Sequence, residues 1–382
     1  MHQHMSAAHF SDRVAARATS DGVDFSLHGL VGVRLVNAGP GEVATVTRQL
    51  GPLRGPIAGT PDLTIRFVER LPAAGTVKLL GVEEGGFTED AFLVLRSKHG
   101  ARVRAQIPLG QVGRPCEIIC ERGLSSVPLL KPIITLTALQ KGVLPIHASA
   151  FSYRGVGVIT TGWQEGSKTG TLLTFMAQGA RFIADDMVYL HAEANRMYGI
   201  PEPINLRARY LQAFPQLRRA IGRRERARLF AAGAAARVAG AARPPRLRRL
   251  LRKLLDGTTA TRIHPHALFG AEACAMAGEP QVVFLTVGRQ APGVEVVPGD
   301  HDEVATRIAT ALEYELLTLK SFYYMFRFAF PDQPNPAFER SADRQQELLR
   351  RALAGKRVYA VYHAYPASVA ELYAAMSPLV NP

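Results

Sequence analysis

The chain has 382 residues, of which 47% are hydrophobic and 20% are charged. This balance excludes wholesale disorder, collagen and a coiled-coil rod, and the length predicts two domains. The first residues lack the basic start and continuous apolar stretch of a signal peptide, and no apolar run is long enough to span a membrane, so we expect a cytoplasmic protein. Cys116, Cys120 and Cys274 suit a reducing compartment, where they would serve as apolar fillers.

The net charge of +14 is concentrated in one segment. Residues 207–262 contain 16 Arg and Lys against two acidic residues, so the rest of the chain is balanced. Within this segment Ala and Leu alternate with Arg, which predicts two or three helices broken at Gly233, Gly240 and Pro244–Pro245. We therefore expect a basic helical insert at residues 208–262.

The N-terminal part, residues 1–125, is expected to form a β-rich domain. Its short runs are alternating or β-branched, and Gly- and Pro-rich turns separate them, as in an antiparallel sheet. The expected strands are 32–37, 43–50, 63–68, 76–82, 91–96, 101–107 and 116–120.

Residues 126–382 alternate strands with helices, which predicts an α/β domain. The expected strands are 144–151, 155–162, 181–190, 281–287 and 357–364, the fourth of these following the insert. The expected helices are 127–142, 171–179, 303–330, 345–353 and 368–376.

A Gly-containing loop between an apolar strand and a helix is the main chemical signal. Gly162, Lys168 and Thr169 fit the spacing of a phosphate-binding loop, in which backbone N–H groups wrap phosphates, Lys reaches the terminal phosphates and the hydroxyl ligates magnesium. Ser167 stands where such loops have Gly before the Lys, and Gly166 offers partial compensation. An ordinary glycine-rich β–α turn is the alternative.

Adjacent carboxylates, Asp185 and Asp186, follow within the apolar run 181–190. Buried carboxylates require a metal, a cation or a catalytic proton, and only one of two successive strand residues can face a nucleotide. A strand end with both groups in solvent is the alternative. His147 lies in an earlier apolar strand, where a hydrogen-bonded core histidine is the more ordinary interpretation.

These residues together resemble a known family. In order and spacing, the motifs of residues 139–207 resemble the catalytic domain of HPr kinase/phosphorylase and the wider HPr kinase-like serine kinases. Weaker similarity continues in 281–287 and 356–376, so about 200 residues are covered, excluding the insert and the N-terminal domain. The resemblance implies a P-loop domain with a mixed sheet and flanking helices.

The resemblance also implies roles. Lys168 would contact the β- and γ-phosphates of ATP, and Thr169 would ligate magnesium with the support of Asp186. Asp185 would be the general base that accepts the proton of the substrate hydroxyl, and His147 would lie beside the transferred phosphate. Phosphoryl transfer needs this combination of positioning and charge neutralisation.

Two positions depart from the family pattern. Ser167 replaces the loop Gly, and Asn205 stands where the family has a metal-supporting Glu, although its amide oxygen could still ligate magnesium. Arg207 matches the family and would steady a phosphate, with an ordinary surface Arg as the alternative.

The leading expectation is a magnesium-dependent kinase that uses ATP, or another phosphoryl donor, to phosphorylate a hydroxyl on a peptide, protein or small molecule. The insert would attract an acidic substrate, or would form a homo-oligomer contact. Nucleic acid is disfavoured because the insert has few aromatic residues for base stacking. The alternatives are a nucleotide-binding regulatory module without turnover and an anion-binding scaffold that acts through the insert.

Overall fold

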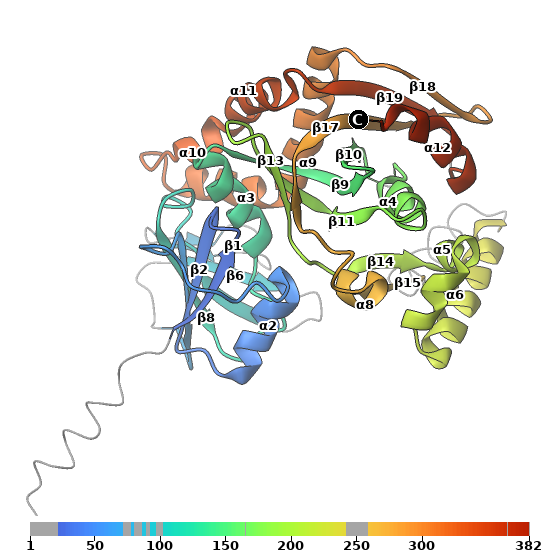
Figure 1. The fold of residues 1–382 in the computed structure, drawn as a ribbon. Coiled ribbons are helices and arrows are strands. Elements are labelled where there is room, and N and C mark those ends of the chain that lie inside the picture. Colours follow the sequence, from blue (N-terminus) through green and yellow to red (C-terminus); the bar gives the residue numbers. More distant parts are fainter. Residues whose placement is uncertain are drawn as a thin grey trace, which may run out of the picture. The chain divides into compact units, whose positions relative to one another are not determined.

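The computed structural model (Figure 1) describes residues 22–71, 78–79, 86–88, 92–96, 102–164, 166–241, 259–364 and 366–381. The described residues divide into two compact units. The first contains the described parts of Met1–Gln49, Leu53–Thr137 and Leu319–Phe338, and the second those of Leu50–Pro52, Ala138–Thr318 and Glu339–Pro382. The segment Leu319–Phe338, which the sequence placed in the C-terminal domain, thus belongs to the first unit.

The first unit is built on a six-stranded sheet in the order β1-β2-β3-β8-β7-β6. Its strands are β1 Val23–Leu27, β2 Val31–Val36, β3 Leu63–Val68, β6 Phe92–Arg96, β7 Arg102–Gln106 and β8 Cys116–Glu121. A separate pair joins β4 Lys78–Leu79 to β5 Gly86–Phe87. The expectation of an antiparallel sheet is wrong in part, because β3 is parallel to both β2 and β8.

The expected strand 43–50 is instead the helix α2, Pro40–Leu50. Val43, Val46 and Leu50 are buried, which is the spacing of one helix face rather than of a strand. Pro40 fits the first helical position, and Gly51 follows the helix with a φ of 77°. These end signals outweighed the β-branched composition, and the helix provides the crossover that parallel β2 and β3 require.

The second unit is α/β, with a nine-stranded mixed sheet in the order β16-β13-β12-β9-β10-β17-β19-β18 and β11 also paired with β9. Its strands are β9 Val143–Tyr153, β10 Val156–Gly162, β11 Arg181–Ala184, β12 Met187–His191, β13 Arg196–Gly199, β16 Ala277–Gly278, β17 Pro280–Gly288, β18 Val294–Pro298 and β19 Arg357–His363. Because β10, β17 and β19 are parallel, their carboxyl ends lie along one edge of the sheet, where α/β proteins bind ligands.

The helix α4, Lys168–Met176, follows β10 and packs against α12, Val369–Met376, as Figure 1 shows. Phe175 of α4 stacks on Phe151 of β9 with ring centres 4.7 Å apart, and both rings are fully buried. A large buried apolar cluster continues from these rings to Tyr210 and Leu372. The first turn of α4 is therefore held rigidly at the carboxyl end of β10.

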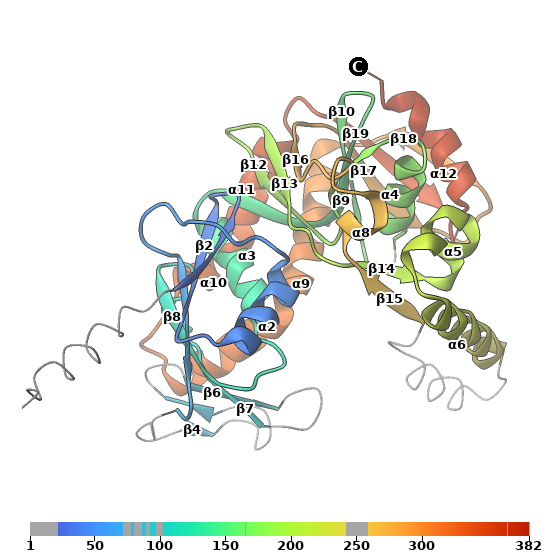
Figure 2. The ribbon, with the colours of Figure 1, turned by 60° about the horizontal axis from the view of Figure 1, so that its bottom comes forward.

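The basic insert begins with three short or medium helices and ends in a strand. The helices are α5 Ala208–Ala213, the 3-10 helix η1 Pro215–Ala220 and α6 Arg223–Ala241. The strand is β15 Ala260–Ile263, which pairs with β14 Ile204–Arg207. Figure 2 shows α5 and α6 beside this strand pair. The expected breaks at Gly233 and Gly240 are wrong, because α6 runs through both: a helical Gly costs about 1 kcal/mol, which the surrounding Ala residues offset. Pro244–Pro245 lie outside the described residues.

The remaining helices are α3 Leu130–Gln140, α8 Pro265–Phe269, α9 His301–Ala329, α10 Pro336–Glu339, α11 Ser341–Leu353 and the 3-10 helix η2 Ser377–Leu379. Within the described parts of the chain, no helix has both the length and the apolar character needed to cross a bilayer. Cys116 and Cys120 are buried, and burial raises the pKa of each thiol to about 12, so these two sulfurs are apolar core atoms.

Candidate functional site

The strand β9 carries His147 and Ser149, two residues apart, on one face of the second unit's sheet. Its neighbour β10 leads into the loop 163–167, which ends at the start of α4. The site is thus assembled from a strand pair and the turn that follows it, as the sequence predicts.

Two loop glycines are required by close packing. A Cβ at Gly162, whose φ is 151°, would lie 2.5 Å from both the carbonyl oxygen and Oγ1 of Thr286 on β17. A Cβ at Gly166 would lie 2.9 Å from the carbonyl oxygen of Trp163, to which the Gly166 N–H donates. Side chains at either position would force the loop away from β17. Glu165 lies outside the described residues.

Ser167 occupies a left-handed conformation, with φ 65° and ψ 15°, immediately before α4. Gly, which has no Cβ, adopts this region freely, whereas L-residues other than Asn and Asp visit it rarely because the Cβ approaches the carbonyl oxygen. Gly at this position would adopt the same conformation without that strain. Ser167 therefore holds the loop in this conformation at a cost in strain.

Lys168 is the first residue of α4 and is buried. Its Nζ donates to the carbonyl oxygens of Gly162 at 3.1 Å and of Trp163 at 2.8 Å. Burial lowers the pKa of the ammonium group, and the nearby carboxylates Asp185 and Asp186 oppose this change. A buried cation at a helix N-terminus is a site for an anion.

Asp185 and Asp186 form the turn between β11 and β12, so the expected single strand 181–190 is wrong. Both strands pair with β9, and a left-handed residue, Asp186 with φ 90°, makes the bend. The bend sends the two carboxylates to different places. Asp185 is buried, whereas the Asp186 side chain is 54% exposed, so the alternative with both groups in solvent is also wrong.

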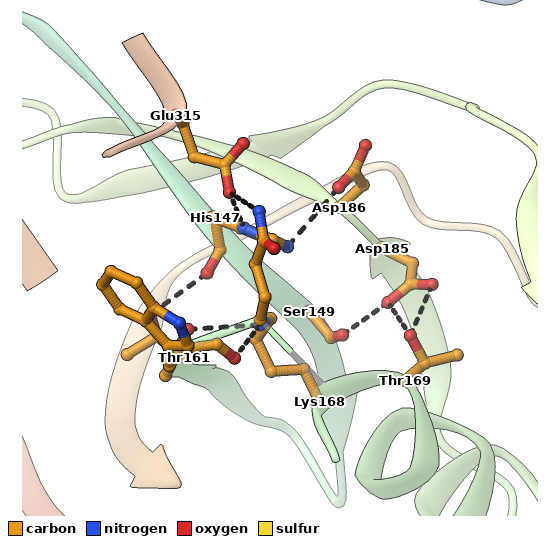
Figure 3. Close-up of polar contacts among 11 residues, drawn as sticks. His147, Ser149, Thr161, Lys168, Thr169, Asp185, Asp186 and Glu315 are labelled. Atoms are coloured by element: carbon orange, nitrogen blue, oxygen red, sulfur yellow. Dashed lines mark hydrogen bonds and ion pairs between the residues drawn. The ribbon is translucent and has the colours of Figure 1, made fainter. Parts of the chain in front are cut away.

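The Asp185 carboxylate is the centre of the site. Oδ1 accepts a 2.5 Å hydrogen bond from Ser149 Oγ, and the Thr169 hydroxyl lies 3.1 Å from both Asp185 oxygens (Figure 3). Burial, reinforced by the charge of Asp186, raises the pKa of Asp185 to about 6, while the two hydroxyl hydrogen bonds and Lys168 act in the opposite direction. A carboxylate with this pKa can exchange a proton near neutral pH.

His147 is held between two acids. Its Nδ1 lies 2.8 Å from Glu315 Oε1, and its Nε2 lies 3.5 Å from Asp186 Oδ1. Gln164 of the loop donates to the same Glu315 oxygen at 3.2 Å, and the hydrogen bond from His147 is the main cause of the lowered pKa of Glu315. Figure 3 shows this connection from β9 to the loop.

The sequence missed Glu315 and Ser149. Glu315 lies in the long helix α9, more than 100 residues after the other site residues, where a single acid on an amphipathic helix gives no signal. Ser149 could have been found, because it follows His147 by two residues and must share its face of the strand.

Asn205 and Arg207 both lie on β14. Asn205 is exposed and its amide oxygen accepts a 3.4 Å hydrogen bond from Arg262 of β15, so the structure does not bring Asn205 into these contacts. In the part of the chain that the structure describes, no group of three His, Cys, Asp or Glu side chains could hold a metal ion. The site's oxygen donors are instead the Thr169 hydroxyl and the carboxylates of Asp185 and Asp186.

Among the cavities that the described residues form, two of different size border the loop. The larger, of about 830 Å³, is lined by the first loop residues, the carboxyl ends of β17 and β19, and the N-terminal half of α9. The smaller, of about 280 Å³, is lined by the start of α4, by α5 and by the segment 366–372.

Comparison with known proteins gives little further information. No family model matches the chain, and no curated protein does. A solved structure, the Hpr(Ser) kinase/phosphatase from Coxiella burnetii, is similar at 14% sequence identity over 48% of this chain and 97% of that chain, with a TM-score of 0.22. Similarity at this level carries no argument about activity, which has to be inferred from the site itself.

Proposed function

We propose that the second unit is an ATP- and magnesium-dependent phosphotransferase that phosphorylates a hydroxyl group. This proposal is carried by three groups that lie together at the N-terminus of α4. Lys168 and Thr169 are the first two residues of the helix, and the buried Asp185 carboxylate contacts the Thr169 hydroxyl. A cation, a hydroxyl and a carboxylate at a helix N-terminus are the groups that phosphoryl transfer requires.

The loop and α4 would bind the phosphates. The first N–H groups of α4 lack partners within the helix and attract anions, and Lys168 would exchange its loop carbonyl contacts for the β- and γ-phosphates. The Lys168 ammonium group already lies against the loop, so this exchange would need only a rotation of the side chain. The Trp163 side chain is 51% exposed and packs against the Tyr314 ring, with ring centres 4.9 Å apart.

The oxygen donors fit magnesium. The Thr169 hydroxyl and the Asp186 carboxylate are hard oxygen ligands, which Mg²⁺ prefers, and the ion would neutralise phosphate charge when bound. Asp186 would hold it together with Thr169. Asn205 lies on β14, outside these contacts, so its amide oxygen would contact the ion only through a bridging water.

Asp185 would act as the general base. As the acceptor hydroxyl attacks the γ-phosphorus, its O–H proton passes to Asp185, the new O–P bond forms and the bond to the ADP oxygen breaks. The pKa of about 6 leaves Asp185 ionised at neutral pH and able to accept this proton. His147, oriented by Glu315, would lie beside the transferred group.

A nucleotide-binding module without turnover is the second candidate. Two features favour it. The strained Ser167 narrows the approach to phosphate, and the exposed Asn205 leaves the metal with fewer ligands.

An acidic hydroxyl-bearing substrate would suit the kinase, since the insert adjoins the site in sequence and is basic.

Calorimetry distinguishes these functions. We expect ATP with magnesium to bind the wild-type protein at moderate salt, to lose affinity in Lys168→Ala and to bind Asp185→Asn normally. Moderate salt suppresses unspecific binding of phosphate to the insert. Binding that is indifferent to Lys168 would contradict both nucleotide-dependent candidates and favour the anion-binding scaffold. A phosphoryl-transfer assay then separates the kinase, which requires Asp185, from the regulatory module, which does not.

A further inference from the structure

The smaller cavity lies beside the phosphate loop and is formed by three elements. The start of α4 contributes Ser167 and Gly170, and the first helix of the insert contributes Arg209, Tyr210 and Ala213. The segment after β19 contributes Pro366, Ala367, Ser368, Val369 and Leu372. We propose that this cavity holds the base of the nucleoside triphosphate, an inference that rests on the proposed function.

The direction of the phosphate chain points to this cavity. The γ-phosphate must lie near Asp185, and in a phosphate loop the Lys reaches the β- and γ-phosphates while backbone N–H groups hold the phosphates nearer the nucleoside. The nucleoside therefore leaves the site past the first turn of α4. Ser167 and Gly170, which flank Lys168 and Thr169, form the wall of the cavity at that point.

Tyr210, which is 7% exposed, lines the cavity next to α4. A Cβ at Gly170 would lie 3.4 Å from Tyr210 Cε1, so the ring rests directly against the first turn of the helix. The Arg209 guanidinium carbon lies 4.9 Å from the centre of this ring, and Nη2 of Arg209 donates to the Tyr210 hydroxyl at 3.1 Å. Flat aromatic and guanidinium groups are the surfaces on which bases stack.

The opposite wall is apolar and fixed. Pro366, Ala367 and Val369 present small side chains, and Ser368 caps α12 by accepting a hydrogen bond from the Glu371 N–H. Leu372 and Tyr210 both belong to the large buried cluster of the second unit. A volume of about 280 Å³ is near the lower end for small-molecule sites and suits one heterocycle.

The larger cavity lies at the other end of the phosphate chain. It borders the first loop residues, Thr161 to Gln164, rather than the first turn of α4. Both guanidinium groups in its lining already pair with acids: Arg289 with Glu295 at 2.6 Å and Arg307 with Glu303 at 2.5 Å. The larger cavity is therefore the competing position for the base, and it can be blocked independently.

The inference gives the beginning of the insert a specific role. Arg209, Tyr210 and Ala213 are insert residues, and without them the cavity would have no wall opposite residues 366–369. The insert would therefore select the phosphate donor, whatever its remaining arginines bind.

The test compares two ligands that share phosphates but not a base. Magnesium ATP and magnesium tripolyphosphate are titrated by calorimetry into the wild type, Ala213→Trp, Tyr210→Leu and the matched control Ala311→Trp, which fills the larger cavity instead. We expect Ala213→Trp and Tyr210→Leu to weaken ATP about tenfold or more and to leave tripolyphosphate within about twofold, whereas Ala311→Trp changes neither. Thermal melting confirms that each variant is folded.

Each of the following results would overturn the base site while leaving the proposed function intact: equal wild-type affinities for ATP and tripolyphosphate, unchanged ATP affinity in both Ala213→Trp and Tyr210→Leu, or loss of ATP binding in Ala311→Trp alone. An equal loss of affinity for both ligands in the folded Ala213→Trp variant would also overturn it, because the effect of the cavity on binding would then not depend on the base. Failure of the wild type to bind either ligand, or binding that Lys168→Ala does not weaken, would instead remove the proposed function.

Discussion

The hydroxyl of Ser149 donates a 2.5 Å hydrogen bond to Oδ1 of Asp185, a residue 36 positions later in the chain. The contact stabilises the ionised carboxylate and is the largest influence that lowers its pKa against the effect of burial. Two adjacent strands, β9 and β11, create it, so the sheet itself sets the basicity of the candidate general base.

Replacing Ser149 with Ala should therefore raise the pKa of Asp185 above about 6. A general base acts only when ionised, so phosphoryl transfer by the wild type should increase as the pH rises through about 6, and the increase in Ser149→Ala should occur at higher pH. A pH–rate profile with any accepted hydroxyl substrate measures this. Ser152→Ala, on the same strand, is the control. A profile that Ser149→Ala leaves in place would show that another group limits the rate.

The free energy of unfolding should also depend on pH through the titration of Asp185. Its pKa is raised in the folded state, so folding favours the protonated form, and this contribution is full below pH 3.8 and lost as the pH rises through about 6. The change from 3.8 to about 6 corresponds to about 3 kcal/mol. Asp185→Asn does not titrate, so its free energy of unfolding relative to the wild type should rise by up to that amount between pH 4 and pH 7.

Urea denaturation of both proteins in magnesium-free buffer at several pH values gives this difference. Ser152→Ala removes no titratable group and is the control, so its difference from the wild type should not change with pH. A constant difference between wild type and Asp185→Asn across the range would contradict the buried, high-pKa carboxylate.

The sequence predicts the parts of this site that neighbouring residues determine, and misses the parts that depend on residues far apart in the chain. Lys168, Thr169 and the loop glycines follow from a local strand–loop–helix pattern, and their arrangement agrees with it. The bend at Asp186 could not be predicted, because the run 181–190 is apolar enough for one strand and only pairing of both halves with β9 requires the turn. Glu315 depends on the packing of α9, which no local pattern encodes.

In the first unit, the same limit explains α2. Val43, Thr45 and Thr47 suit a strand by composition, and the decisive information is the burial of Val43, Val46 and Leu50 on one helix face. The parallel pairing of β3 with β2 and β8 is likewise a property of the whole sheet.

Ser167→Gly should relieve the left-handed strain before α4 and open the approach to phosphate. Strain of this kind costs about 1 kcal/mol, part of which is offset by the greater freedom of Gly in the unfolded chain. We expect a small gain or no change in melting temperature and an increase in affinity for magnesium ATP of several-fold. Ser167→Ala retains the Cβ and is the control. Equal effects of Gly and Ala would assign the change to the lost hydroxyl rather than to the backbone.

Glu315→Gln should slow phosphoryl transfer while leaving ATP affinity within about twofold. Glu315 holds His147 through a 2.8 Å contact and also accepts a hydrogen bond from the loop residue Gln164. The amide oxygen of Gln at position 315 can still accept from Gln164, so loss of the charge mainly weakens the placement of His147. We expect a loss of about tenfold in kcat with little change in KM for ATP, as for an interaction made only in the transition state. Steady-state kinetics at saturating acceptor measure both, and a rise in KM with unchanged kcat would contradict this role.

Gly162→Ala should be severely destabilising, because the added Cβ would lie 2.5 Å from Oγ1 and the carbonyl oxygen of Thr286. The neighbouring atoms are partly backbone of the central strand β17, which cannot move without disturbing its pairing with β10. We expect a loss of about 2 kcal/mol or more in the free energy of unfolding, typical of overpacking in a rigid core. Gly155→Ala, at a turn with open space around it and a positive φ, isolates the backbone component of the loss. The Gly162 variant must lose more stability than the Gly155 variant in urea denaturation, since only the former adds the clash with β17; equal losses would mean that the loop relaxes away from Thr286.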